Sequence, residues 1–122
     1  MSITQLRQPT QCHLWQSENL RPQDVDEALE VIKTLADESH YSMHLRKCRT
    51  CGQLYADVWY EIVDWDEGKD QMFSFYIPVQ TDAEVEQLKR ASPMSLDLLD
   101  FFPRINEDRQ GGTRKVAWIG KS

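Results

Sequence analysis

The sequence predicts an α+β fold, with an antiparallel sheet of four to five strands and two to three helices packed on one face. Apolar residues alternate over 53–65 and again over 71–79, which is typical of strands, and a short turn between them makes a hairpin. Over 22–37 apolar residues instead recur with the period of an amphipathic helix. With 122 residues, the chain is expected to be one domain, 1–122.

Residues 1–19 are polar and are expected to form an irregular arm or one short strand. The helix over 22–37 can begin at Pro22, because proline lacks the N–H that would be unpaired at the first helical position. Asp24 lies near the positive end of the helix dipole. The expected buried stripe consists of Val25, Ala28, Leu29, Ile32, Leu35 and Ala36.

Three strands are expected in the middle of the chain. Residues 41–48 alternate and run into a cysteine turn, and residues 53–65 form a longer strand. Gly68 allows the turn over 66–69, and residues 71–79 return as the partner strand. One face of the longer strand is apolar and is expected in the core: Leu54, Ala56, Val58, Tyr60 and Ile62.

Thr81 and Glu84 form a capping box, in which each side chain accepts a hydrogen bond from the other residue's backbone N–H. They begin a helix that we expect to end near Ala91. Three elements are expected after it: a short helical turn over 96–101 stopped by Pro103, a glycine turn at 111–112, and a last strand over 114–119.

The chain is acidic, with 20 Asp and Glu against 14 Lys and Arg and a net charge of −6. A nucleic-acid-binding protein usually presents a basic face. Here the basic clusters are small: Arg46, Lys47 and Arg49, then Arg114 and Lys115. Charge therefore favours a basic protein partner and makes nucleic acid an unlikely one.

No apolar run reaches the roughly 20 residues of a membrane helix. The first residues lack the basic and apolar regions of a secretory signal. The three cysteines are an odd count, which fits reduced or metal-bound thiols better than a disulfide framework. We therefore expect a cytoplasmic protein with no membrane contact.

Cys48 and Cys51 flank a turn that ends in glycine, and such a turn supplies half of a tetrahedral zinc site. The remaining ligands are sought in His44 and in Cys12 or His13 of the N-terminal arm. The predicted set is Cys12, His44, Cys48 and Cys51, which uses all three cysteines. One difficulty is that His44 and Cys48 lie about 13 Å apart on an extended strand, so the strand would have to bend.

Two alternatives remain for the cysteine turn. One is a redox pair, although thioredoxin-type pairs open a helix whose N-terminus stabilises the thiolate, whereas this pair precedes a strand. The other is two reduced thiols in a glycine turn. If zinc is bound, we expect a structural ion, because no catalytic base is evident beside the turn.

Aromatic and acidic side chains form a stripe on the second face of the strand over 53–65: Tyr55, Asp57, Trp59, Glu61 and Trp65. Aromatic residues anchor protein interfaces, and flanking acids steer a basic partner. The stripe is therefore predicted to bind a partner. The alternative is a helix packed over this face, which would bury the rings.

Other motifs are incomplete. Residues 64–70 carry acids at alternate positions as a calcium loop does, but Phe75 stands where the closing Glu belongs. Residues 120–122 are similar to the end of a phosphate-binding loop, but the required earlier glycine is missing. No histidine lies in a recognisable nucleophile motif, so an enzyme is unsupported.

The middle of the chain contains a cysteine element followed by several spaced residues: Cys48-Arg49-Thr50-Cys51-Gly52-Gln53-Leu54-Tyr55, then Asp64-Trp65, Gly68, Asp70 and Pro78-Val79. This arrangement resembles a group of small uncharacterised bacterial proteins with a Cys-x-x-Cys-Gly-Gln element followed by an acidic strand and hairpin. The similarity covers residues 44–79 and extends to 116–119. The resemblance implies a bacterial cytoplasmic protein and no particular activity.

The first hypothesis is a small acidic intracellular protein-binding protein, most concretely an immunity or inhibitor protein that neutralises a basic toxin or nuclease. The second is a zinc-ribbon-like module that binds nucleic acid or the transcription machinery, because basic residues flank the cysteine turn. The third is an enzyme that uses the metal or the thiols, which requires an open coordination position or a reactive thiol.

Overall fold

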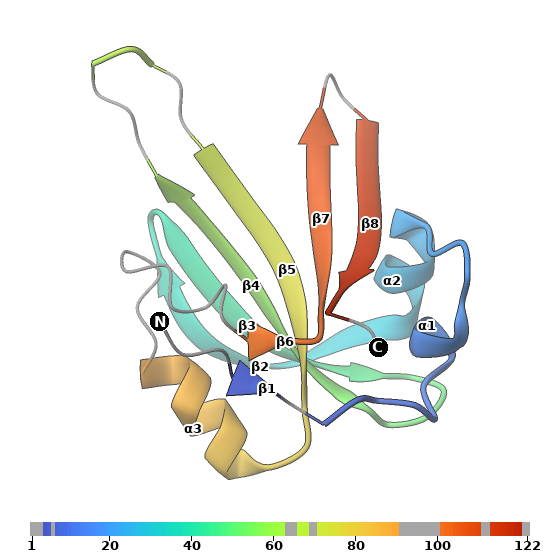
Figure 1. Cartoon of the computed structure of the whole chain (residues 1–122). Coiled ribbons are helices and arrows are strands. Elements are labelled where there is room, and N and C mark those ends of the chain that lie inside the picture. The colour runs from blue at the N-terminus through green and yellow to red at the C-terminus, as the bar shows by residue number, and fades with distance from the viewer. Residues whose placement is uncertain are drawn as a thin grey trace.

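The main feature of the structure, a computed structural model, is a six-stranded antiparallel sheet with the order β2-β3-β4-β5-β7-β8 (Figure 1). The structure describes residues 4–5, 7–62, 66–68, 71–90, 101–110 and 113–120. The strands of this sheet are β2 (Leu29–Glu38), β3 (Tyr41–Cys48), β4 (Leu54–Ile62), β5 (Gln71–Val79), β7 (Arg104–Gln110) and β8 (Thr113–Ile119).

Two very short strands form a separate parallel pair, and three helices complete the fold. The short strands are β1 (Thr4–Gln5) and β6 (Phe101–Phe102). The helices are α1 (His13–Gln16), α2 (Pro22–Ala28) and α3 (Asp82–Arg90). The α+β class and the antiparallel sheet are therefore confirmed, but the main sheet has six strands and not four to five. Among the described residues, none of the helices is long and apolar enough to cross a membrane.

The sequence reasoning missed β7, and the reason lies in its composition. This strand is almost entirely polar, with Ile105 as its one aliphatic residue, so no apolar alternation marks it. Its backbone is paired on both sides, with β5 over three residue pairs and with β8 over seven. Tertiary pairing therefore makes a strand from a segment whose own pattern predicts none.

The helix predicted over 22–37 is wrong in its second half. Helix α2 ends at Ala28, and residues 29–38 form β2, an edge strand of the sheet. The pairing of β2 with β3 shifts register twice, between Val31 and Lys33 and between Thr34 and Ala36. Each irregularity resets the alternation of side chains, so the apolar residues fall at a spacing that resembles a helix.

The helices cover both faces of the sheet, which corrects the expectation of one covered face. Figure 1 shows α3 on one side and the pair α1 and α2 on the other. Val85 and Leu88 of α3 pack in one apolar cluster with Val58 and its neighbours. Leu14 of α1 and Val25 of α2 pack in a second cluster: Cys12, Leu14, Trp15, Val25, Ala28, Leu29, Cys48, Tyr55, Tyr76, Ile105 and Val116.

Several local predictions are confirmed. The strands expected over 41–48, 71–79 and 114–119 correspond to β3, β5 and β8, and β4 covers 54–62 of the strand expected over 53–65. The α3 capping box forms, with Glu84 N–H donating to Thr81 Oγ1 at 3.2 Å and Thr81 N–H donating to Glu84 Oε1 at 3.3 Å. The helical turn expected over 96–101 lies outside the described residues, apart from Phe101, which is in β6.

Candidate metal centre

Three cysteines from two distant parts of the chain meet at the turn between β3 and β4. The Sγ atoms of Cys12, Cys48 and Cys51 all lie within 4.8 Å of one another. Cys12 and Cys48 are buried, and Cys51 is exposed. A tetrahedral zinc ion with Zn–S bonds of about 2.3 Å needs sulfurs about 3.8 Å apart. The three sulfur atoms would therefore have to move only slightly closer together to hold the ion. These three residues can therefore bind a metal.

The turn between β3 and β4 sets two of the three thiols in place. Gly52 N–H donates to the Cys48 carbonyl at 2.9 Å, and Cys48 N–H donates to the Gln53 carbonyl at 2.8 Å. Gly52 has φ +81°, a left-handed conformation that glycine adopts without strain. A Cβ at this position would make an ordinary contact, so the backbone angle and not space requires glycine.

The environment of Cys48 favours a thiolate. Burial acts to raise the pKa of this thiol, but hydrogen bonds from the backbone N–H groups of Cys51 and Thr50 oppose burial, as do side-chain hydrogen bonds with Cys51 and Cys12. The net result is a lowered pKa for Cys48. A thiolate is the form that a metal ion binds.

Cys12 is in the opposite situation. Burial raises the pKa of Cys12 to about 12, and the hydrogen bond with Tyr55 only partly offsets this. Without a cation Cys12 is therefore a neutral thiol at physiological pH. A bound metal ion would supply the charge that makes it a ligand, because coordination deprotonates a thiol.

Tyr55 lies directly behind the cysteines, and this corrects its predicted role as a partner contact. Its hydroxyl donates to Cys12 Sγ at 3.1 Å, and the side chain is fully buried. Burial, followed by the hydrogen bond with Cys12, raises the pKa of Tyr55 above its usual range, so the phenol remains a donor. Its ring centroid lies 6.4 Å from that of Trp118, which contacts Trp15 edge to face at 4.8 Å.

His44 does not reach the cysteines, and this corrects its predicted role as a ligand. It lies in the middle of β3, opposite Thr34 of β2 and Asp57 of β4. Pairing on both sides keeps this part of β3 extended. His44 therefore stays well separated from Cys48 along the strand, and the bend that the predicted site required is not present. His13 is closer, with Nδ1 at 3.8 Å from Cys48 Sγ. Its position next to Cys12 in the sequence was the signal for it.

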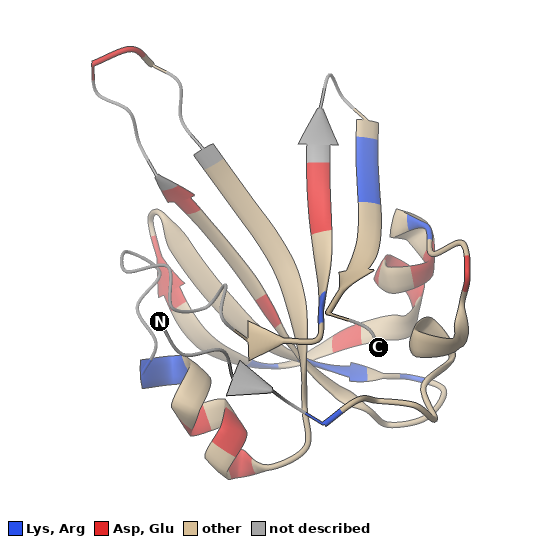
Figure 2. Cartoon of the chain, in the orientation of Figure 1, with Lys and Arg blue, Asp and Glu red and all other residues tan. Residues whose placement is uncertain are grey.

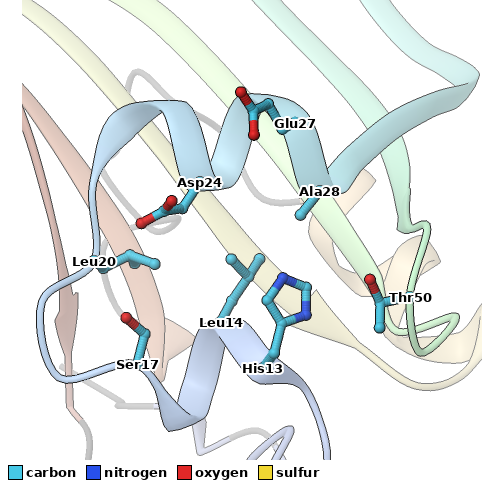
Figure 3. A pocket seen from close by; sticks show the side chains of 8 residues that line it. All are labelled: His13, Leu14, Ser17, Leu20, Asp24, Glu27, Ala28 and Thr50. Atoms are coloured by element: carbon cyan, nitrogen blue, oxygen red, sulfur yellow. The ribbon is translucent and has the colours of Figure 1, made fainter.

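A pocket of about 410 Å³ opens beside the cysteines, between α1, α2 and the β3–β4 turn (Figure 3). Figure 3 shows the His13 imidazole in this pocket, with Thr50 on one side and the carboxylates of Asp24 and Glu27 on α2 above it. A hydrogen bond from Arg21 lowers the pKa of Asp24, and the charge of His13 contributes to the same shift. The cysteine cluster therefore borders a space lined with further donor atoms.

The other members of the predicted stripe have different surroundings. Asp57 accepts a 2.6 Å hydrogen bond from Arg46, yet burial is the larger influence and raises the pKa of Asp57. Glu61 pairs with His40 at 2.9 Å, and Trp59 is half-buried. Trp65 lies outside the described residues. Asp57 is thus held inside the protein, while Trp59 and Glu61 remain partly accessible.

No protein-family model, curated protein or solved structure matches this chain.

Proposed function

We propose that this chain is a small acidic protein-binding protein whose fold is stabilised by a structural zinc ion. The observation that carries the proposal is the convergence of Cys12, Cys48 and Cys51. Zinc suits a site of three thiolates, and structural zinc sites are built mainly from cysteine and histidine. When bound, the ion would supply a cross-link and no chemistry.

The place of the cluster in the fold explains why a cross-link would matter here. Cys12 belongs to the N-terminal arm and directly precedes the single-turn helix α1. The arm is otherwise fixed through Trp15, which contacts Trp118, and through the Trp118 indole, which donates to the Leu14 carbonyl at 2.9 Å. A zinc ion between Cys12 and the β3–β4 turn would fasten this arm to the sheet.

Metal analysis of protein purified without chelator tests this part of the proposal. We expect about one zinc per chain, and we expect Cys48→Ser to lose the metal and to melt at a lower temperature, because metal binding contributes folding free energy. Cys12→Ser should do the same. Less than about a tenth of an equivalent of zinc, with unchanged melting of Cys48→Ser, would leave three free thiols and refute the structural role.

The surface for a partner lies at the end of the sheet far from the metal centre. We call it the acidic end and define it as Asp37, Glu38, Glu61, Asp66 and Glu67. Figure 2 shows acidic residues at the tip of the β4–β5 hairpin and at the end of β4. Glu38 lies opposite Tyr41, which pairs with Tyr60 next to Glu61, so Glu38 and Glu61 lie at the same end of neighbouring strands.

An apolar contact accompanies these charges. Met72 on β5 is 54% exposed and lies opposite Glu61 in the β4–β5 ladder. An exposed apolar side chain among acids is typical of a surface that attracts a basic protein and then excludes water on contact. The partner we propose is a basic toxin or nuclease, which this chain would neutralise.

A pull-down with two matched variants tests the partner. The variant Asp37→Lys/Glu38→Lys changes the acidic end, and Glu18→Lys/Glu86→Lys makes the same charge change elsewhere. We expect the wild type and the control to retain a basic protein, with weaker retention at higher salt, and the acidic-end variant to lose it. Equal retention by all three proteins would place the contact elsewhere. If the wild type retains no protein at all, the proposal is refuted.

The nucleic-acid alternative is not favoured by the positions of the basic residues. Arg46 is paired with Asp57 at 2.6 Å, and Arg49 is paired with Glu30 at 3.1 Å. Two of the three basic side chains that flank the cysteine turn are therefore neutralised by carboxylates. Retention on a DNA or RNA column that falls with salt would nevertheless restore this alternative.

A further inference from the structure

We propose that His13 is the fourth zinc ligand, through Nδ1, and that it completes a closed Cys3His centre with Cys12, Cys48 and Cys51. This inference rests on the proposed structural zinc. It replaces the ligand set that the sequence predicts, in which His44 took this position.

The distance to one sulfur supports His13 Nδ1 as the coordinating atom. The ring must turn to reach the other two sulfurs, because the described donor atoms that all lie within 4.8 Å of one another are those of Cys12, Cys48 and Cys51. In a tetrahedral site with Zn–S of about 2.3 Å and Zn–N of about 2.0–2.1 Å, sulfur and nitrogen lie about 3.6 Å apart. His13 Nδ1 lies 3.8 Å from Cys48 Sγ. His13 is exposed, so its imidazole can turn toward the other two sulfurs without displacing core atoms. Cys12 and His13 would then approach the ion from the start of one helical turn.

The other histidines have different surroundings. His40 Nδ1 lies 2.9 Å from Glu61 Oε1, at the acidic end. His44 lies within the sheet, and its Nδ1 is buried without a hydrogen-bond partner in the described part of the chain. Neither can reach the cysteine turn while β3 and β4 stay paired.

The carboxylates of the pocket are the remaining competitors. Asp24 is engaged by Arg21, whose backbone N–H donates to Oδ2 at 3.0 Å and whose Nη2 donates to Oδ1 at 2.9 Å. Glu27 lines the same pocket and offers an oxygen. A site with three thiolates already carries excess negative charge, so a neutral imidazole suits the fourth position better than another anion.

Asp24 has a supporting position. A zinc-bound histidine commonly gives its other ring N–H to a carboxylate, which fixes its orientation. His13 and Asp24 line one pocket. Asp24 is therefore the pocket carboxylate that we assign to this role.

Cobalt substitution and zinc competition test the inference. We expect wild-type protein to give the intense d–d bands of a tetrahedral Co²⁺ site with thiolate ligands. His13→Ala should shift and weaken these bands and lower zinc affinity by more than about 100-fold, the upper end of the effect of losing a merely supporting group. His44→Ala and Glu27→Gln are the matched controls, and both should retain the wild-type spectrum and affinity.

A further variant separates ligation from folding. His13→Cys restores a donor atom, so it should regain tight binding and show the spectrum of four thiolates. If His13→Ala binds zinc as tightly as wild type and keeps its spectrum, His13 is not a ligand, and a change in His44→Ala or Glu27→Gln would identify the true one. If the wild type itself binds neither metal, the proposed structural zinc has failed, which is a different result.

Discussion

Tyr55 connects the sheet to the cysteine cluster of Cys12, Cys48 and Cys51. Its hydroxyl donates to Cys12 Sγ at 3.1 Å from a fully buried position. Hydrogen bonds to a ligating sulfur tune its affinity for the metal, and their loss commonly costs 10–100-fold. We expect Tyr55→Phe to lower zinc affinity by about tenfold while the fold is retained, measured by competition with a chromophoric chelator.

Tyr60 provides the control for that prediction. It is also buried on β4, but its hydroxyl has no hydrogen-bond partner among the described residues. Removal of an unsatisfied buried hydroxyl is neutral or stabilising. Tyr60→Phe should therefore leave zinc affinity unchanged and should not lower the melting temperature. Equal losses of affinity in both variants would assign the effect to the ring environment and not to the hydroxyl.

Asp57 gives a pH-dependent prediction. Burial, only partly offset by Arg46, raises the pKa of Asp57, so the folded protein takes up a proton here at a higher pH than the unfolded chain. The stability that this carboxyl contributes is therefore fully present below its unfolded pKa of about 3.9 and is lost as pH rises through the folded pKa. Asn cannot take up this proton.

Urea unfolding of wild type and Asp57→Asn at two pH values provides the measurement. We expect the unfolding free energy of the wild type, minus that of Asp57→Asn, to be larger near pH 4.5 than at pH 7. A difference that is smaller in acid would show that the ion pair with Arg46 outweighs burial, and an equal difference at both values would show that the two effects balance.

At the scale of elements, the N-terminal arm and the cysteine turn should respond to the metal as one unit. Hydrogen exchange with and without a chelator tests this. We expect chelation to speed amide exchange in α1 and in residues 48–53, because the proposed ion joins them. Helix α3 should exchange at an unchanged rate, since Val85 and Leu88 pack in the cluster on the other face of the sheet. Faster exchange throughout the chain would indicate that the ion stabilises the whole fold.

β2 shows how an element can be assigned wrongly from its pattern. Its side chains are mostly exposed, including Val31 at 49% and Ile32 at 48%. A helix would have buried Ile32 with Leu29, whereas the edge strand leaves Ile32 in solvent and places Leu29 in the second cluster. β-branched residues at 31, 32 and 34 are compatible with either element, and pairing with β3 decides between them.

At the scale of the whole molecule, two apolar clusters share one sheet. Val58 and Ile77 belong to the α3 cluster, while Tyr55 and Tyr76 of the same strands belong to the other. The clusters are therefore joined through the backbone of β4 and β5. We expect the chain to unfold as one cooperative domain.

Leu88→Ala tests this cooperativity. The substitution removes a fully buried side chain from the α3 cluster and should cost about 2–5 kcal/mol. Tryptophan fluorescence, to which Trp15 and Trp118 on the opposite face contribute, should shift to the same lower denaturant midpoint as the far-ultraviolet circular dichroism. Two separate midpoints would instead indicate two units that unfold independently.

The features that the sequence determined by itself are those set by neighbouring residues. The cysteine turn follows from two thiols and a glycine, the start of α3 from Thr81 and Glu84, and the β4–β5 hairpin from alternation around Gly68. Each depends on interactions that span a few positions along the chain. Such interactions are readable because the residues that make them are always close in space.

The tertiary structure alone decided how distant segments meet. Cys12 reaches the turn as expected, but His13 and not His44 lies beside it, because paired strands hold His44 in place. Tyr55 donates a hydrogen bond to Cys12 and does not face a partner, because α1 and α2 cover its face of the sheet. The polar strand β7 and the edge strand β2 exist through backbone pairing with partners far along the chain. The local pattern of side chains does not identify those partners. The backbone groups that pair two strands are the same whichever side chains the strands carry.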